Sequence, residues 1–249
     1  MFALKSEFQD KEQILHQGLQ LYRKTFRMAF PYALVAALCT FAPLLFIGVY
    51  APLNTSFPAT HTQHLFVMVL CWAVGLILYS ALLFRQYCFC YAVPSNFIRA
   101  MKQALIHFIP LLAVGALYAM IVLSGTMMLI IPGMIFSISL LFSFAIVITD
   151  NQTVLQTLTT SHHLVRNHWW HVCLTFSFPV LLNLFLSFGA LAGVVGLSLH
   201  WQLPTSQIYY LVFVTNVFIQ ALCMPFTFAI MLVLLHDLRQ RKTALTPHW

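Results

Sequence analysis

The sequence predicts an all-α integral membrane protein with six transmembrane helices in a single membrane domain, residues 1–249. Hydrophobic residues make up 61% of the chain and charged residues only 7%, whereas a soluble domain carries roughly 25% charged residues. The apolar residues fall into long runs, and Lys and Arg cluster in alternate segments between the runs. These three observations together indicate a multi-pass membrane protein rather than a soluble one.

Six runs are long enough to cross a bilayer core, for which a helix needs about 20 residues. The longest run, residues 104–149, is expected to hold two spans, because Ser124-Gly125 and Pro132-Gly133 favour a turn within it. The expected spans are about 28–50, 65–91, 104–125, 132–149, 172–199 and 207–235.

The segments that flank the spans are expected to lie on one side of the membrane. Residues 1–27 read as an amphipathic helix that lies in the interface with its apolar face down; its apolar positions are Phe8, Leu15, Leu19, Tyr22 and Phe26. Residues 236–249 read as a tail. Lys and Arg occur before the first span, in the second and fourth loops and after the last span, while the three other loops have none. The positive-inside rule therefore predicts that both termini are cytoplasmic.

Three of these segments resemble one another. The stretches that begin at Leu19, Asn96 and His162 each carry Arg or Lys, then aromatic or histidine residues, and then a proline near the following span. We hypothesise three repeated units, each an interfacial helix followed by a helical hairpin. The alternative is that basic and aromatic residues mark the cytoplasmic boundary of any hairpin membrane protein.

The formal charge of +7 is thus expected at the cytoplasmic surface, where it suits anionic lipid head groups better than nucleic acid. Candidate contacts to lipid phosphates are the basic residues next to the odd-numbered spans: Arg23, Lys24, Arg27, Arg99, Lys102 and Arg166. Candidate interfacial anchors are Tyr22, Trp169 and Trp170, because aromatic residues gather at membrane interfaces.

The stretch SHHLVRNHWWHV, residues 161–172, holds four of the eleven histidines. Thr153 and Gln156 have capping-box spacing, so a helix is expected to begin there and to lead into this stretch. The histidines could belong to a polar interfacial seam, to a pH-sensitive surface or to a metal site; they are His162, His163, His168 and His171. No acidic or cysteine ligand lies near them in a zinc-binding spacing, so we predict no metal.

Amides inside the expected spans allow two interpretations. Asn183 lies in the fifth span, and Asn216 and Gln220 lie one turn apart in the sixth. Such groups commonly join helices by hydrogen bonds. They could instead line the polar cavity of a transporter or a lipid-translocating protein.

Several of these motifs occur in a recognisable order. They are LYRKTF from Leu21, the IPG of residues 131–133 followed by Asp150, and SHHLVRNHWW from Ser161. The chain thereby resembles the YciC-like bacterial inner-membrane proteins and the related membrane domain of some glycerophosphodiester phosphodiesterases. The resemblance implies the bacterial inner membrane and a role in envelope maintenance. It does not imply phosphodiesterase activity, because no soluble catalytic domain is present in the sequence.

No catalytic arrangement is evident. Asp150, His236 and Asp237 lie at span ends, where such residues are expected to be solvated, and no spacing matches a nucleophile with its base or a metal centre. We therefore expect a non-enzymatic protein without a cofactor that binds membrane lipids, or other inner-membrane or cytoplasmic proteins. The transporter is the alternative.

Overall fold

The computed structural model describes residues 10–45, 59–150 and 152–245, and most of these residues are helical with no strand among them. Its six helical stretches that are long and apolar enough to cross a membrane confirm the predicted class. The helices are α1 (Lys11–Leu45), α2 (Ala59–Cys90), α3 (Phe97–Ile106), α4 (Phe108–Met128), α5 (Ile130–Ser139), α6 (Ser143–Thr149), α7 (Val154–Val165), α8 (Trp169–Trp201) and α9 (Thr205–Leu245).

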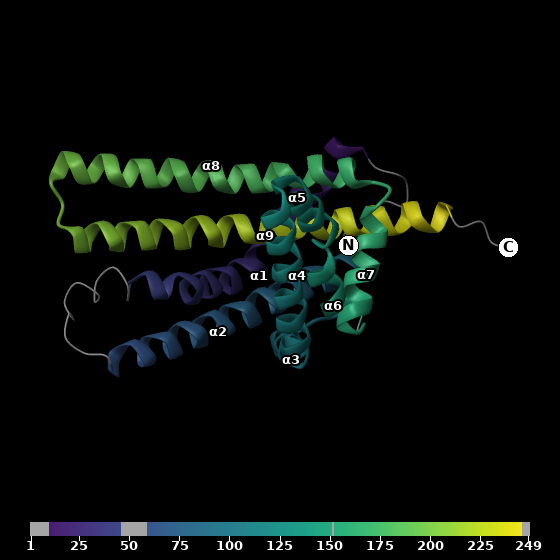
Figure 1. Cartoon of the computed structure of the whole chain (residues 1–249), viewed down its shortest axis with the longest axis horizontal. Coiled ribbons are helices and arrows are strands. Elements are labelled where there is room, and N and C mark those ends of the chain that lie inside the picture. The colour runs from purple at the N-terminus through teal and green to yellow at the C-terminus, as the bar shows by residue number, and fades with distance from the viewer. Residues whose placement is uncertain (1–9, 46–58, 151, 246–249) are drawn as a thin grey trace.

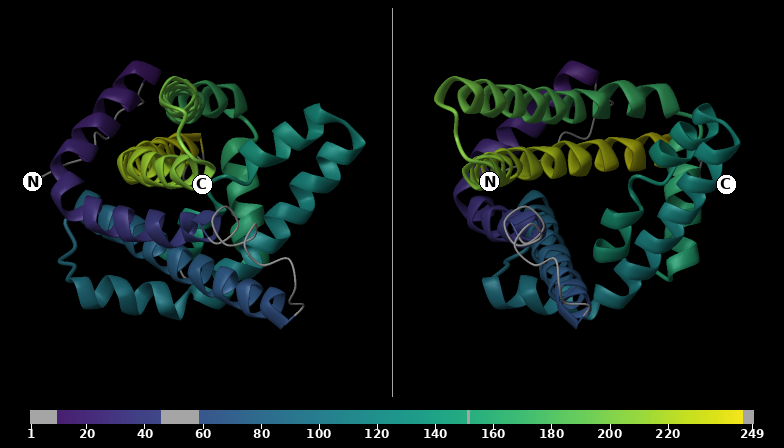
Figure 2. Two further views of the ribbon diagram at one scale, coloured as in Figure 1. Left: turned by 90° about the vertical axis from the view of Figure 1, so that its left-hand side faces the viewer. Right: turned by 60° about the vertical axis from the view of Figure 1, so that its left-hand side comes forward.

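The helices run in two main directions. The helices α8 and α9 pack side by side along the longest dimension of the molecule, and α9 also packs against α1 (Figure 1). The hairpin of α4 and α5 projects across that direction (Figure 2). The largest buried apolar cluster joins the two parts, and its fully buried members include Leu21 of α1, Phe142 and Ile146 beside and within α6, and Leu234 of α9. The candidate spans therefore do not form one set of parallel helices.

Within the described residues, the amphipathic segment expected over residues 1–27 is not a separate helix. Helix α1 runs without a break from Lys11 into the first span, and Figure 2 shows that it changes direction part-way along. Pro31 lies inside it and explains the bend, since proline removes one helical hydrogen bond and clashes with the preceding turn. Before the bend, Ile14 and Leu21 are fully buried, and a Cβ at Gly18 would touch Ile230 of α9. This segment packs on α9 rather than lying alone in an interface.

Two other boundaries differ from expectation. The fourth span is interrupted between α5 and α6, where the chain turns at Leu140 and the Ser143 hydroxyl donates to the Leu140 carbonyl at 2.6 Å. The expected tail after residue 235 is helical as far as Leu245. By contrast, α2 ends at Cys90, within one residue of the prediction.

The three hairpins α1–α2, α4–α5 and α8–α9 fit the hypothesis of a triplicated unit in part. Short helices α3 and α7 precede the second and third hairpins, whereas the first has only the bent start of α1. The common origin of the three units stays a prediction.

The α4–α5 hairpin closes through a glycine contact. A Cβ on Gly133 would overlap the Thr126 hydroxyl oxygen and come within 2.9 Å of the Thr126 Cα and backbone N. Because the obstacle includes backbone, we expect Gly133→Ala to lower the free energy of unfolding by about 1–3 kcal/mol, as overpacking does.

The matched control is Gly193→Ala in α8, where a Cβ would meet no heavy atom within 4 Å. Alanine favours a helix over glycine, so this variant should unfold at the wild-type temperature or above it. Thermal unfolding in detergent, followed by circular dichroism, measures both. Equal melting temperatures for the two variants would contradict the close contact.

Candidate functional site

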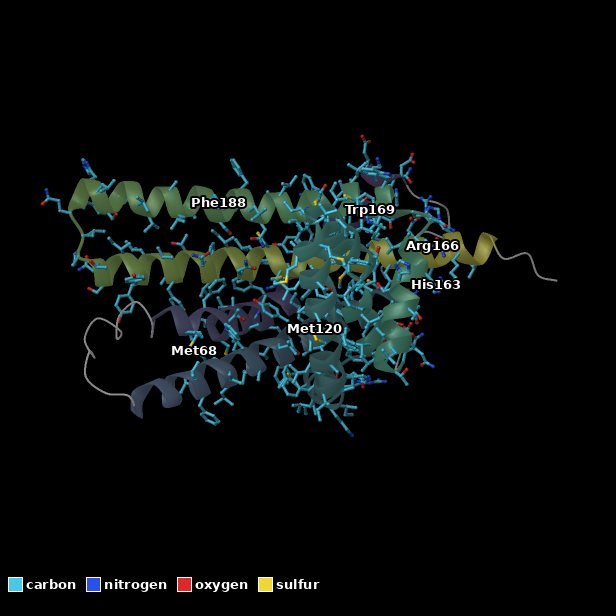
Figure 3. All side chains as sticks on the ribbon, in the orientation of Figure 1. Met68, Met120, His163, Arg166, Trp169 and Phe188 are labelled. Carbon is cyan, nitrogen blue, oxygen red and sulfur yellow. The ribbon has the colours of Figure 1, made fainter. Side chains whose placement is uncertain are left out.

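The histidine-rich stretch forms the junction between α7 and α8. Helix α7 begins as predicted, with the Thr153 backbone N–H donating to the Gln156 Oε1 at 3.3 Å. It ends at Val165, and the His168 backbone N–H donates to the Val165 carbonyl at 2.9 Å. The chain therefore makes a tight turn between the two helices. Figure 3 shows His163, Arg166 and Trp169 together at this junction, far from Phe188 on α8.

A cleft of about 790 Å³ lies between this junction and α5. A buried hydrogen bond links its two sides, with the Ser161 hydroxyl of α7 donating to the Ser139 carbonyl of α5 at 2.8 Å. One wall is apolar and consists of Ile131, Met134 and Ile135. The volume falls within the roughly 300–1,000 Å³ of small-molecule sites.

The opposite wall is rich in hydrogen-bond donors and positive charge. It includes His162, Arg166, His168, Trp169 and His171. The Trp169 Nε1 is buried and has no hydrogen-bond partner among the described residues. Among the described residues that line the cleft, none is acidic. The cleft thus combines a hydrocarbon surface with groups that suit an anion.

A buried carboxylate lies behind this wall, and sequence reasoning missed it. Asp237 of α9 is fully buried, and its Oδ2 accepts from Arg241 Nε at 2.7 Å. The His171 Nε2 lies 3.4 Å from the same oxygen. The expectation that Asp237 is an ordinary solvated boundary residue is therefore wrong. The spacing of Asp237 and Arg241, four residues apart on a helix, was the available signal for an ion pair.

A second ion pair connects α9 to the end of α6. Arg239 Nη2 donates to Asp150 Oδ2 at 2.6 Å, and the Thr149 hydroxyl donates to the other carboxylate oxygen at 2.7 Å. Both charged side chains are about a quarter exposed. The Arg239–Asp150 pair holds the α9 C-terminal segment against the end of α6, and the contact of Asp237 with His171 holds it against the start of α8.

The buried charges affect the histidine at the start of α8. Burial is the main cause that lowers the pKa of His168 from its ordinary value, and the nearby Arg241 and His171 lower it further. The Asp237 carboxylate opposes this shift. Near neutral pH His168 is therefore held in its uncharged form more firmly than an ordinary histidine.

The other predicted lipid contacts lie outside the cleft. These basic side chains are exposed on α1 and α3: Arg23, Lys24, Arg27, Arg99 and Lys102. Of the predicted anchors, Trp170 is 71% exposed, and Trp169 packs partly against the core. Tyr22 contacts the Phe226 ring of α9, with 5.6 Å between centroids, so it serves helix packing.

The predicted polar cavity is only partly assembled. The Asn183 side chain donates to Gln220 Oε1 at 3.5 Å, and Ser187 donates to Asn183 at 3.3 Å. Asn216 instead donates to the Val212 carbonyl of its own helix at 2.8 Å. Only the Asn183–Gln220 bond joins α8 to α9, and the cleft described above is lined by other residues.

Within the described ranges, no three His, Cys, Asp or Glu side chains come together in a way that could hold a metal ion. His162 and His163, neighbours on α7, have ring centroids 6.1 Å apart and face different directions. A comparison of the chain with family models, curated proteins and solved structures found no match.

Proposed function

We propose that this chain is a non-enzymatic, multi-pass protein of the bacterial inner membrane, with both termini in the cytoplasm, that binds an anionic phospholipid in the cleft between α5 and the α7–α8 junction. The composition of the cleft carries this proposal. A phospholipid has a phosphate next to hydrocarbon chains, and the cleft sets Arg166 and histidine donors opposite the apolar side chains of α5. The role in envelope maintenance rests on the family resemblance.

The chemistry of the lining also supports the choice of lipid. With no acidic side chain among its described lining residues, the cleft gives a cationic head group such as choline or ethanolamine no carboxylate partner. An anionic head group without an amine, such as phosphatidylglycerol, is complementary to it. The distant polar pair Asn183 and Gln220 is used in joining two helices, so we do not assign it to transport.

The test compares two arginines. Arg166 lines the cleft, whereas Arg99 is exposed on α3 and donates to the Pro94 carbonyl at 3.1 Å. We expect Arg166→Gln to weaken phosphatidylglycerol binding about fivefold, since one basic residue near an anionic surface contributes about 1 kcal/mol. Arg99→Gln should change it by less than twofold. Native mass spectrometry with titrated phosphatidylglycerol measures both affinities.

Equal losses in the two variants would assign lipid binding to the basic surface in general and reject the cleft. If the wild-type protein retains no phospholipid at all, the same surface is better explained as a binding site for partner proteins.

A further inference from the structure

A second cavity, of about 520 Å³, is lined by residues of the candidate membrane spans. Its walls come from all three hairpins, with Leu83 of α2, Leu111 of α4, Phe144 of α6 and Met231 of α9 among them. It has no lining residue in common with the cleft. The cavity is therefore a separate feature and its interpretation does not depend on the proposed function.

The few polar side chains in its wall are already hydrogen-bonded. The hydroxyls of Thr40, Ser80 and Thr227 donate to carbonyls of their own helices, at 2.8, 2.6 and 3.0 Å respectively. Trp72 Nε1 donates to the Thr40 carbonyl at 3.3 Å. These four groups are satisfied within the protein and offer little to a polar ligand.

A cavity of this kind is a poor site for water and a good one for hydrocarbon. A buried water needs two to four polar partners, whereas apolar cavities stay dry and take up apolar molecules. Filling the space with hydrocarbon restores dispersion contacts that an empty cavity lacks. The cavity also reaches the surface, because Trp72 lines it and is nevertheless 55% exposed. Trp72 lies within the span of α2, so this opening faces the bilayer.

We propose that this cavity is a binding site for one long hydrocarbon chain, which enters sideways from the bilayer beside Trp72. The ligand class is an acyl chain, carried by a membrane phospholipid or present as a free fatty acid. The acyl chain lies between the three hairpins and contacts Leu83, Phe144 and Met231.

Photocrosslinking tests this site. The full chain is reconstituted in phosphatidylcholine nanodiscs that contain a trace of phosphatidylcholine with a diazirine at the end of one acyl chain, and in a second arm a diazirine-bearing palmitic acid. After illumination, labelled peptides are located by mass spectrometry. We expect labels at Phe144 or Met231, in addition to general labels at exposed residues such as Phe188, which is 67% exposed.

A matched pair of threonines on α9 supplies the control. Thr227 lines the cavity, and Thr215 lies outside it; both hydroxyls donate to the carbonyl four residues earlier. Thr227→Phe fills the cavity and should lower labelling at Phe144 and Met231 at least tenfold relative to Phe188, while Thr215→Phe should leave the ratio unchanged. Ser80→Leu fills the same cavity from α2 and serves as a second variant if Thr227→Phe does not fold.

Labelling of the cavity by either probe supports the site, and the probe that labels it shows whether the acyl chain comes from a phospholipid or from a free fatty acid. No label in the cavity from either probe, or a ratio that is insensitive to both filling variants, overturns the proposal. Arg166→Gln, which alters the cleft, should leave the cavity labels intact, so failure of the two sites can be told apart.

Discussion

Replacing Asp237 with alanine is expected to lower the free energy of unfolding by about 3–5 kcal/mol. The carboxylate is fully buried and lies 2.7 Å from Arg241 Nε, whose side chain is 21% exposed. Removal of the carboxylate leaves a largely buried guanidinium without this partner, and the cost of this loss exceeds the modest net value of the pair itself. Unfolding in a mixed detergent series, followed by tryptophan fluorescence, measures the change.

Two further variants separate an unpaired charge from a lost contact. Asp150→Ala breaks the pair with Arg239, whose two side chains are about a quarter exposed and are screened by solvent, so we expect a loss of about 1 kcal/mol or less. The double variant Asp237→Leu with Arg241→Met replaces both charges by apolar groups and should recover most of the stability lost in Asp237→Ala. A double variant as unstable as the single one would show that Asp237 acts through some other contact.

The class of the fold and most helix boundaries follow from local patterns in the sequence. The apolar run that stops before Pro94 and Asn96 is enough to place the end of α2, and Thr153 with Gln156 is enough to start α7. Such local patterns do not specify the angle between one hairpin and the next. That angle depends on side-chain packing in the buried cluster around Phe142, so the transverse course of α4 and α5 could not be read from the spans.

The sequence was enough to predict which residues form the candidate site, but not which of their side chains are buried. Proximity to a span end suggested solvent for Asp237, although the helix continues and buries it beneath His171. Similarly, the apolar stripe of the first segment suggested a membrane surface. The small residue Gly18 within that stripe was a sign of close helix contact, and Ile230 of α9 provides it. Which partner covers an amphipathic face is a tertiary question that periodicity leaves open.

The binding of phosphatidylglycerol is expected to strengthen about fivefold as the pH falls from 8 to 5. His168 lines the cleft, and its pKa is lowered from the ordinary value of histidine, so it is uncharged near neutral pH and gains its charge towards the acidic end of this range. One added cation near an anionic head group contributes about 1 kcal/mol, which is about fivefold in affinity. Phosphatidylglycerol keeps its own charge over this range, so the protein supplies the pH dependence.

The surroundings of His168 decide the acidic end of this range. It faces Arg241 and Asp237 of α9 and His171 of α8, and its lowered pKa delays its protonation in the free protein. An anionic ligand favours the cation and so raises the pKa of His168 in the complex. Affinity therefore rises as the pH falls through the pKa of the complex and levels off only below that of the free protein. The contribution of His168 appears at lower pH than an ordinary histidine would give.

Vesicle flotation between pH 5 and 8, with circular dichroism at each pH to confirm folding, measures this dependence. His168→Gln should flatten the rise. His16→Gln is the matched control, because His16 is an exposed histidine on α1 next to Gln20 and outside the cleft. A wild-type affinity that stays constant over this range, or a control as flat as His168→Gln, would reject His168 as its source.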